Sequence, residues 1–560
     1  MRGFKVNFRI LIAQFCCILF GLVLVLRMIQ INFNQSDFLV EKGINQYGQL
    51  KTIPTKRGKI YDRNGELLAI SAEAYSVFVR PSVFKKNPHN WNRLESYLGQ
   101  TAGYIEKRIN NTQSDKFTYL QPRLLAPQTM QQIMDLELKG LGKELRYQRF
   151  YPQREALAHL IGYTNDEHVG QEGIELIFDD YLSGKNGKKK VFLDAKGREI
   201  ASSDMIVPMV PGKDLFLTVD HRAQFYSNEI LIESLKFHEA DSGSIMIIDS
   251  GTGEIIAMVN APTFNPNSRA TFEAYRVRNR AVTDSYEPGS TLKPFVIAAA
   301  LENRVLNPLS KINTSPGLLT IGNWKIGDGR DHGIITVEQI LEKSSNVGVA
   351  KISDRLTGDG VLGILGRFGF GEYTGAMLPG ESTGHFPEQR RMNFLKKRSL
   401  SFGYGISVTT AQLARAYSVF ANHGYLKDLK ITKDLISREA AQIVSRKTSN
   451  QILNMLKKAV LQGTGKLARI DSFDVSGKTG TVRKAKADGY SNEEHTVFFA
   501  GILPTKTTNY VCVVVIDNPR VNGSTGGNVA APIFSKLMRE LIRTFALEPP
   551  YNSSNLQGEI

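Results

Sequence analysis

Two apolar runs joined by a glycine-containing turn make up the stretch Ser244-Ile-Met-Ile-Ile-Asp-Ser-Gly-Thr-Gly-Glu-Ile-Ile-Ala-Met-Val259. Each run has the length of a strand, and the turn is typical of a β-hairpin. The runs Thr496–Gly501 and Tyr510–Val515, on either side of Pro504, predict a second hairpin. The long segment between the hairpins reads mostly as helices and loops. With a helical pattern over Asn528–Leu547, this predicts an α/β (α+β) fold whose sheet comes from both ends of one domain.

Length and composition indicate a folded protein of two or three domains. The chain has 560 residues, 42% of them hydrophobic and 22% charged, which excludes a disordered or collagen-like protein. The net charge of +16 favours anionic surroundings such as lipid headgroups, nucleic acid or an acidic polymer, and its sign alone does not choose among them. The cysteines are Cys16, Cys17 and Cys512, which provide no disulfide framework and no cysteine metal site.

The N-terminus carries a candidate membrane span. Residues Ile10 to Leu26 contain no charge and are flanked by basic residues, including Arg9 and Arg27. A helix of this length just crosses a bilayer, and its positive flank belongs in the cytoplasm. A cleaved signal peptide is the alternative, but no small-residue cleavage site follows the run. We therefore expect a cytoplasmic tail at 1–9, an uncleaved signal anchor at 10–31, and the rest of the chain outside the cytoplasm.

The remainder divides at a proline- and glycine-containing break near Val210-Pro-Gly-Lys-Asp214, which precedes a strand pattern over Leu215–Val219. Residues 32–212 mix short strand-like runs with basic turns and contain no catalytic constellation. We predict a non-catalytic domain there, a second domain over 213–547, and a loose polar tail over 548–560.

Ser290 and Lys293 lie in Tyr286-Glu-Pro-Gly-Ser-Thr-Leu-Lys-Pro-Phe295, directly before an apolar helical run. Their spacing places them on one helix face, where a lysine of lowered pKa can activate a serine nucleophile. The alternative is an ordinary N-cap serine. A second Ser-x-x-Lys, at Ser82 and Lys85, follows Pro81 and is expected to be surface loop.

Two further motifs strengthen the case for Ser290. Ser344-Ser-Asn346 follows a helical run and can bring a hydroxyl and an amide to the same cleft, although a Ser-Ser-Asn also occurs at 553–555. Lys478-Thr-Gly-Thr481 is the one Lys-Thr-Gly in the chain and precedes the second hairpin. Its cation and hydroxyls suit a substrate that ends in a carboxylate, and Gly480 would let the substrate backbone approach.

The ordered set of Ser-x-x-Lys, Ser-x-Asn and Lys-Thr-Gly is the motif set of penicillin-binding proteins and serine β-lactamases. The chain resembles a class B penicillin-binding protein of the FtsI type, which cross-links septal peptidoglycan. Further motifs cover its N-terminal part and resemble the family's pedestal, or dimerisation-like, domain: Arg57–Ala69, Arg149–Pro152 and Gly173–Glu175. Asn279–Asp284 resembles the septal branch more than the elongation branch. Arg57 and Glu175 are expected to form a salt bridge within this pedestal.

The resemblance implies catalytic roles. Ser290 would attack a D-Ala-D-Ala stem peptide to form an acyl-enzyme, with Lys293 as the base. Ser344 and Lys478 would relay the proton to the leaving group, and Asn346 would hold the peptide amide. Three further residues would bind the substrate, the two threonines holding its terminal carboxylate: Thr479, Gly480 and Thr481. β-Lactams would acylate the same serine.

The family assignment leaves several functions open. Ser345 stands where class A β-lactamases carry aspartate, and no deacylating Glu-x-x-Leu-Asn follows, so transfer to an amine is favoured over hydrolysis. The alternatives are an elongation-type transpeptidase, a D,D-carboxypeptidase, and a non-catalytic β-lactam sensor or division scaffold. The resemblance implies lipid-linked precursor as substrate, an FtsW-like glycosyltransferase and other division proteins as partners, and residence in the bacterial inner membrane with a periplasmic catalytic domain. We expect no metal, cofactor or nucleic acid.

Overall fold

We analysed a computed structural model of the chain. It describes residues 2–34, 48–86, 88–112, 117–121, 123–193, 199–268, 270, 272–321, 324–356, 360–388, 392–434, 438–486 and 489–550. Most of the tail expected at 548–560, including the Ser-Ser-Asn at 553–555, lies outside these residues. Contacts divide the chain into one unit of Met1–Lys56 with Gly184–Gly212, and a second of Arg57–Ser183 with Lys213–Ile560. The division into domains at 32–212 and 213–547 stays a prediction.

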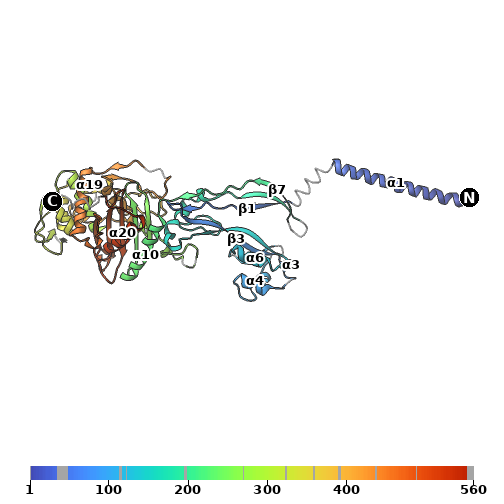
Figure 1. The fold of residues 1–560 in the computed structure, drawn as a ribbon, viewed down its shortest axis with the longest axis horizontal. Coiled ribbons are helices and arrows are strands. Elements are labelled where there is room, and N and C mark those ends of the chain that lie inside the picture. Colours follow the sequence, from blue (N-terminus) through green and yellow to red (C-terminus); the bar gives the residue numbers. More distant parts are fainter. Residues whose placement is uncertain are drawn as a thin grey trace. The chain divides into compact units, whose positions relative to one another are not determined.

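The first unit contains the long helix α1 (Arg2–Asn34) and a small sheet (Figure 1). Within α1, Phe8–Ile31 has a mean hydropathy of 2.5 and is long and apolar enough to cross a membrane. The expected anchor at 10–31 lies inside this segment. The sheet is antiparallel in the order β1-β6-β7, with β1 at Gly48–Ile53, β6 at Gly187–Leu193 and β7 at Glu199–Val207.

The N-terminal part of the second unit is built on the long strands β3 (Leu67–Val79) and β5 (Leu141–Phe150), which pair antiparallel. The short strands β4 (Thr118–Tyr119) and β2 (Ile60–Tyr61) also pair with β3. Small helices gather along β3 in Figure 1 around a core that includes Phe84: α3 (Pro81–Phe84), α4 (Trp91–Tyr97), α5 (Tyr104–Asn110) and α6 (Pro127–Met134). Helix α3 contains Ser82, so the expectation of a loop there is wrong. The fixed φ of Pro81 favours the first position of a helical turn.

A buried ionic cluster links three segments of this part of the unit. Arg57 donates through Nε to Glu175 at 2.6 Å and through Nη1 to Asp179 at 2.6 Å. Arg149 donates through Nε to the other oxygen of Glu175 at 2.7 Å. Glu175 is fully buried, so two guanidinium groups compensate the cost of desolvating its charge. The predicted salt bridge between Arg57 and Glu175 is confirmed.

The predicted hairpins form the centre of a five-stranded antiparallel sheet. Its order is β10-β9-β21-β20-β19, so strands from both ends of the domain lie side by side as expected. The strands are β9 (Ser242–Asp249), β10 (Ile255–Ala261), β19 (Ser476–Lys486), β20 (Gly489–Pro504) and β21 (Asn509–Asp517). The strand expected at Leu215–Val219 differs: β8 covers Leu215–Phe216 and pairs in parallel with β2 instead of joining this sheet.

Alternation along the strands divides their side chains between two cores. In β9, Ile245 and Ile247 pack with helices α10 (His221–His238) and α20 (Ala530–Phe545). Met246 and Ile248 point to the opposite face. That face is covered by α13 (Lys293–Glu302), α18 (Thr410–Ala421) and α19 (Arg446–Leu461). Since both faces are covered by helices, the strands are apolar on both sides, and the predicted α/β class is confirmed.

Shorter elements complete the second unit. Between β5 and β8 lie η1 (Arg154–Leu157), α7 (Ala158–Ile161), α8 (Gly173–Ile177) and α9 (Asp179–Leu182). Between β10 and α18 lie α11 (Ala274–Val277), α12 (Arg280–Thr283), β11 (Ser285–Tyr286), η3 (Gly289–Leu292), β12 (Lys311–Asn313), β13 (Leu318–Ile321), β14 (Trp324–Gly327), β15 (Ile334–Thr336), α14 (Val337–Lys343), α15 (Asn346–Asp354), α16 (Gly360–Arg367), α17 (Phe394–Ser401) and β16 (Val408–Thr409). Before β19 lie β17 (Tyr425–Leu426), β18 (Ala441–Gln442) and η5 (Lys466–Ala468).

Candidate active site

Ser290 lies in the 3₁₀ turn η3, which leads directly into α13. Gly289 before it has a φ of +54°, and its N–H donates to the carbonyl of Gly403 at 3.2 Å. A Cβ at Gly289 would meet Val482 at 2.4 Å, so glycine is required here by both conformation and space. The Ser290 side chain is half-buried, and among the described residues its hydroxyl has no hydrogen-bond partner. The turn thus presents a free hydroxyl at the start of a helix, as the sequence predicts.

Lys293 is fully buried at the first position of α13. Its Nζ donates to the Ser344 carbonyl at 2.5 Å, to Asn346 Oδ1 at 2.7 Å and to Ser344 Oγ at 3.2 Å. Burial lowers the pKa of Lys293 well below its ordinary value, and the nearby charge of Lys478 lowers it further. A lysine of lowered pKa gives up its charge more readily and can then accept a proton.

Lys478 is also fully buried and approaches Ser344 from strand β19. Its Nζ donates to Ser344 Oγ at 2.9 Å and to the Thr479 carbonyl at 3.2 Å. Burial lowers the pKa of Lys478 to about 7. The hydroxyl of Ser344 therefore bridges two buried lysines, which gives an unbroken path for a proton between them.

Ser344 holds this bridging position through an unusual backbone conformation. It ends α14 with a φ of +59°, in the left-handed region that non-glycine residues seldom adopt. The next residue, Ser345, is buried and accepts a hydrogen bond from the Gly348 N–H as the N-cap of α15. Strained residues of this kind concentrate at functional sites, because the surrounding structure must hold them in place.

Asp328 fixes the segment from Ser345 to Val347, a role that the sequence analysis missed. Its carboxylate accepts from the Ser345 hydroxyl at 2.5 Å and from the backbone N–H groups of Asn346 at 2.5 Å and Val347 at 2.9 Å. Its charge also opposes the lowering of the Lys293 pKa. Asp328 thus positions Asn346 and, through it, Lys293. No spacing motif links this loop residue to Ser344, so no pattern in the sequence indicated its role.

Replacing Asp328 by alanine is expected to slow penicillin acylation by about 10- to 100-fold, because the α15 N-terminus loses its acceptor. It should also move the acidic limb of the pH–rate profile to lower pH, since a charge that raises the Lys293 pKa is gone. Stopped-flow acylation rates across pH test both effects. Asp331→Ala, an exposed change on the same loop, is the control. An unchanged profile in Asp328→Ala would contradict the electrostatic part of this role.

The Lys-Thr-Gly segment lies on an edge strand. Among the described residues β19 pairs with β20 alone, so its other edge is unpaired. Thr479 Oγ1 lies 2.7 Å from Thr464 Oγ1, and Thr481 Oγ1 accepts from the Gly526 N–H at 2.9 Å. A Cβ at Gly480 would meet Thr291 at 3.0 Å and the Pro288 carbonyl at 3.1 Å. Gly480 thus lets β19 pack against the Ser290 turn, and its expected role in the approach of the substrate backbone stays a prediction.

Glu287 is another site residue that the sequence analysis missed. It accepts from the Gly405 N–H at 2.8 Å and from the Tyr490 hydroxyl at 3.1 Å. Burial raises the pKa of the Glu287 carboxyl. Through these bonds Glu287 ties the segment before Ser290 to the loop at Gly405 and to strand β20.

One group outside this site has the composition of a metal site. Ligand atoms of Asp62, Asp220 and His221 lie within 4.8 Å of one another. His221 Nδ1 lies 2.8 Å from Asp62, and Asp220 accepts from Asn64 at 2.8 Å and Arg222 at 2.7 Å. These contacts satisfy the group within the protein, and it caps the start of α10.

Family comparison agrees with this arrangement. Residues 243–539 match the penicillin-binding protein transpeptidase domain, and residues 52–217 match the penicillin-binding protein dimerisation domain. The chain belongs to the penicillin-binding protein transpeptidases. The serine, the two lysines and the Ser-x-Asn segment all fall inside the first match.

Curated relatives extend the similarity over nearly the whole chain. A probable peptidoglycan D,D-transpeptidase PbpC of Pseudomonas aeruginosa is 34% identical over 98% of this chain and 97% of its own length. The peptidoglycan D,D-transpeptidase FtsI of Escherichia coli K12 is 33% identical over 95% of this chain and 91% of its own length. The chain is thus a peptidoglycan D,D-transpeptidase of the FtsI/PenA class, a serine acyl-transfer enzyme.

Solved structures share the fold. Penicillin-binding protein 3 of Mycobacterium tuberculosis, complexed with aztreonam, has a TM-score of 0.69 at 25% identity and covers 89% of this chain and 99% of its own. The transpeptidase domain of Burkholderia pseudomallei penicillin-binding protein 3 has a TM-score of 0.55 at 29% identity, covering 60% of this chain and 98% of its own.

Proposed function

We propose that the chain cross-links peptidoglycan stem peptides at the division septum through an acyl-enzyme on Ser290. The observation that carries this proposal is the pair of buried lysines, Lys293 and Lys478, joined through the hydroxyl of Ser344. Such a pair provides a base of lowered pKa three residues from the free serine and a proton donor on the other side of Ser344. The similarity to FtsI supports the septal assignment.

In the acylation step, Ser290 Oγ attacks the carbonyl of the penultimate D-alanine as its proton passes to Lys293 Nζ. The backbone N–H groups of Ser290 and Thr481 stabilise the oxyanion, where one lost donor typically costs about 3 kcal/mol. The C–N bond to the terminal D-alanine then breaks, and Lys478 protonates the leaving amine through Ser344. This leaves an ester on Ser290 and releases D-alanine.

In the transfer step, the amine of a neighbouring stem peptide attacks the ester carbonyl. Before this attack, the proton on Lys293 passes through Ser344 to Lys478, which gave its own proton to the leaving amine. Lys293 then takes a proton from the attacking amine, the C–O bond to Ser290 breaks, and Lys293 returns that proton to Ser290 Oγ. Asn346 holds the donor amide, while Thr479 and Thr481 hold the terminal carboxylate before it leaves. A β-lactam enters the same first step, but no amine leaves the site because the ring nitrogen stays attached.

Helix α1 supports a proposed location for the enzyme. With basic residues at its start, its N-terminus lies in the cytoplasm and the catalytic part in the periplasm, anchored in the bacterial inner membrane. Here the enzyme meets glycan strands made from lipid-linked precursor by an FtsW-like partner.

Product analysis tests the reaction. Full-length protein in detergent is incubated with a donor pentapeptide and an excess of acceptor amine, and D-alanine release is compared with cross-linked product. Cross-linking supports the proposal, release without cross-linking indicates a carboxypeptidase, and acylation by penicillin without turnover indicates a sensor. Depletion in cells separates the two transpeptidase roles: filaments indicate a septal enzyme and rounded cells an elongation enzyme.

The rate of penicillin acylation is expected to fall as pH rises above about 7, approaching tenfold per pH unit. The reason is that Lys478, with its pKa of about 7, loses the charge that attracts the ligand carboxylate. Stopped-flow rates with a penicillin measure this limb. A penicillin methyl ester, which has no carboxylate, should still show the fall, because deprotonated Lys478 also cannot protonate the ring nitrogen through Ser344. A flat profile with the ester would contradict this proton-donor role and assign the limb to carboxylate binding alone.

A further inference from the structure

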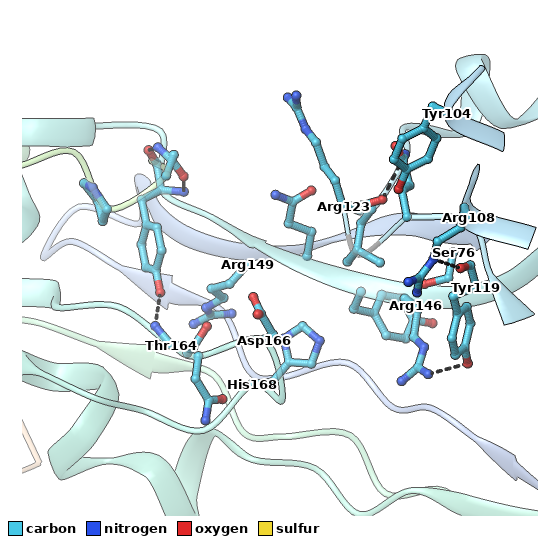
Figure 2. Close-up of a pocket in the computed structure, with 18 residues that line it drawn as sticks. Ser76, Tyr104, Arg108, Tyr119, Arg123, Arg146, Arg149, Thr164, Asp166 and His168 are labelled. Atoms are coloured by element: carbon cyan, nitrogen blue, oxygen red, sulfur yellow. Dashed lines mark hydrogen bonds between the residues drawn. The ribbon is translucent and has the colours of Figure 1, made fainter. Parts of the chain in front are cut away.

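A cavity of about 730 Å³ lies on the strands β3 and β5 and the loops beside them. It is separate from the residues that contact Ser290, Lys293 and Lys478. Its wall contains four arginines and one acidic residue, Asp166. Figure 2 shows Arg149 beside Thr164 and His168, and Arg108 and Arg146 beside Tyr119. A concave site with this excess of positive charge favours an anionic ligand.

Three buried polar atoms on this wall have no hydrogen-bond partner among the described residues. They are Arg149 Nη2, Gln121 Oε1 and His168 Nδ1. Buried polar groups are nearly always paired, and leaving one unpaired typically costs about 1–3 kcal/mol. Three such atoms around one cavity indicate that it is built to hold a polar molecule.

Arg149 is the anchor of this wall. Its side chain is held in place by Glu175 at 2.7 Å from Nε and by the Gly58 carbonyl at 2.8 Å from Nη1. The residue is 6% exposed. Its Nη2 has no partner among the described residues, so Arg149 brings a fixed and unpaired donor to the wall of the cavity.

The other three arginines of the wall can contact the same ligand. No carboxylate pairs with Arg108 or Arg123 within the described part of the chain; Arg108 donates to the Tyr119 carbonyl at 3.3 Å. Arg146 contacts the Tyr119 hydroxyl at 3.1 Å and Glu144 at 3.2 Å, which partly neutralises it. Gln121 Oε1 needs a donor, so the ligand must carry an N–H or O–H group as well as an acid.

We propose that this cavity binds a short peptide with free carboxylates. Carboxylates satisfy the arginines, amide N–H groups satisfy Gln121, and the volume lies in the range of sites for small ligands. Two sources share this chemistry: the stem peptide of peptidoglycan, a choice that rests on the proposed function, and an acidic protein segment. The protein would thus sense such a peptide at a site separate from the acylating serine.

Isothermal titration calorimetry on the full-length protein in detergent tests the proposal. The probes are a stem tripeptide without either D-alanine, triglutamate, and neutral trialanine amide. Both acidic peptides, or one of them, should bind more tightly than the neutral one, and added salt should weaken binding. Binding of the tripeptide alone assigns the site to cell-wall peptides, and binding of triglutamate as well assigns it to acidic segments in general. Equal or absent binding of all three would overturn the proposal.

Variants tie the binding to the cavity. Arg123→Glu is expected to weaken binding at least tenfold, and Gln121→Leu by several-fold. The control is Arg93→Glu, an exposed change on α4 outside the cavity wall, which should stay within twofold of wild type. Unchanged affinity in Arg123→Glu would overturn the site. Arg149 is left intact because its loss would expose the buried charge of Glu175.

Fluorescent-penicillin labelling of the same variants separates this proposal from the proposed function. Arg123→Glu should be labelled as wild type is, because Arg123 lies outside the catalytic machinery. Peptide binding in a wild-type protein that penicillin does not label would sink the proposed function and leave the cavity assigned. Labelling by penicillin without peptide binding would overturn the assignment of the cavity and leave the proposed function intact.

Discussion

Membranes that contain the Ser290→Ala variant are expected to lose labelling by fluorescent penicillin and all cross-linking. The expected fall in acylation rate is on the order of 10⁴-fold or more, because a covalent step without its nucleophile has no alternative route. Lys293 and Lys478 keep their contacts with Ser344 in this variant, so the loss reflects chemistry rather than folding. Gel fluorescence and mass spectrometry of the acylated peptide measure it.

The second Ser-x-x-Lys of the chain supplies a matched control. Ser82 lies in the one-turn helix α3 and precedes Lys85 at the same spacing as the pair at Ser290. Ser82→Ala should therefore keep wild-type labelling. Retained labelling of folded Ser290→Ala would refute the active-site assignment. A loss of labelling in Ser82→Ala would show that the Ser-x-x-Lys motif had been assigned to the wrong serine.

The Lys478→Met variant is expected to lose acylation by about 10²- to 10³-fold and yet to be more stable than wild type. Lys478 is fully buried with a pKa of about 7, so at pH 7 about half of the folded molecules lack the proton that the unfolded chain binds fully. Each unit of pKa difference corresponds to about 1.4 kcal/mol, and methionine has no such cost. After allowance for the hydrogen bonds that Lys478 loses, we expect the free energy of unfolding of Lys478→Met to exceed that of wild type by roughly 2 to 4 kcal/mol at pH 7.

The pH dependence of this gain gives the decisive measurement. Between pH 7 and about 10 the unfolded lysine binds a proton and the folded Lys478 does not, so wild-type stability rises with pH across this window. Lys478→Met should flatten the rise. Melting temperatures of full-length protein in detergent across this window test it, with exposed Lys447→Met as the control. A destabilised Lys478→Met would contradict the idea that function here is maintained at the expense of stability.

Patterns of apolar and turn residues predicted the hairpins and helices that form between residues close together in the sequence. The hairpins of β9 with β10 and of β20 with β21 follow from strand alternation and turn residues, and α20 from its apolar face. The pairing of β8 with β2 was not predictable, because it joins segments far apart in the sequence and contains two residue pairs. A strand that short has no periodicity to detect.

The candidate site shows the same limit. The spacing of Ser290 and Lys293 predicted a shared helix face, but the contact of this pair with Ser344, Asn346 and Lys478 was predicted only through resemblance to a family, since no spacing joins the three motifs. The structure brings the lysines, Ser344 and Asn346 within hydrogen-bond distance and packs β19 against the Ser290 turn. Asp328 and Glu287 were missed because single carboxylates in loops carry no pattern. The catalytic role of each residue stays a prediction until tested.

The unpaired edge of β19 has a consequence for antibiotic resistance. A ligand that aligns with this edge is held by main-chain N–H and C=O groups, which are the same for every amino acid except proline. Substitution cannot delete such contacts one at a time as it can a side-chain contact. Escape from an inhibitor that uses the edge would require the strand itself to shift, through residues that pack behind it such as Phe498 and Phe499. Resistance mutations should therefore map to the support of β19 more than to its surface.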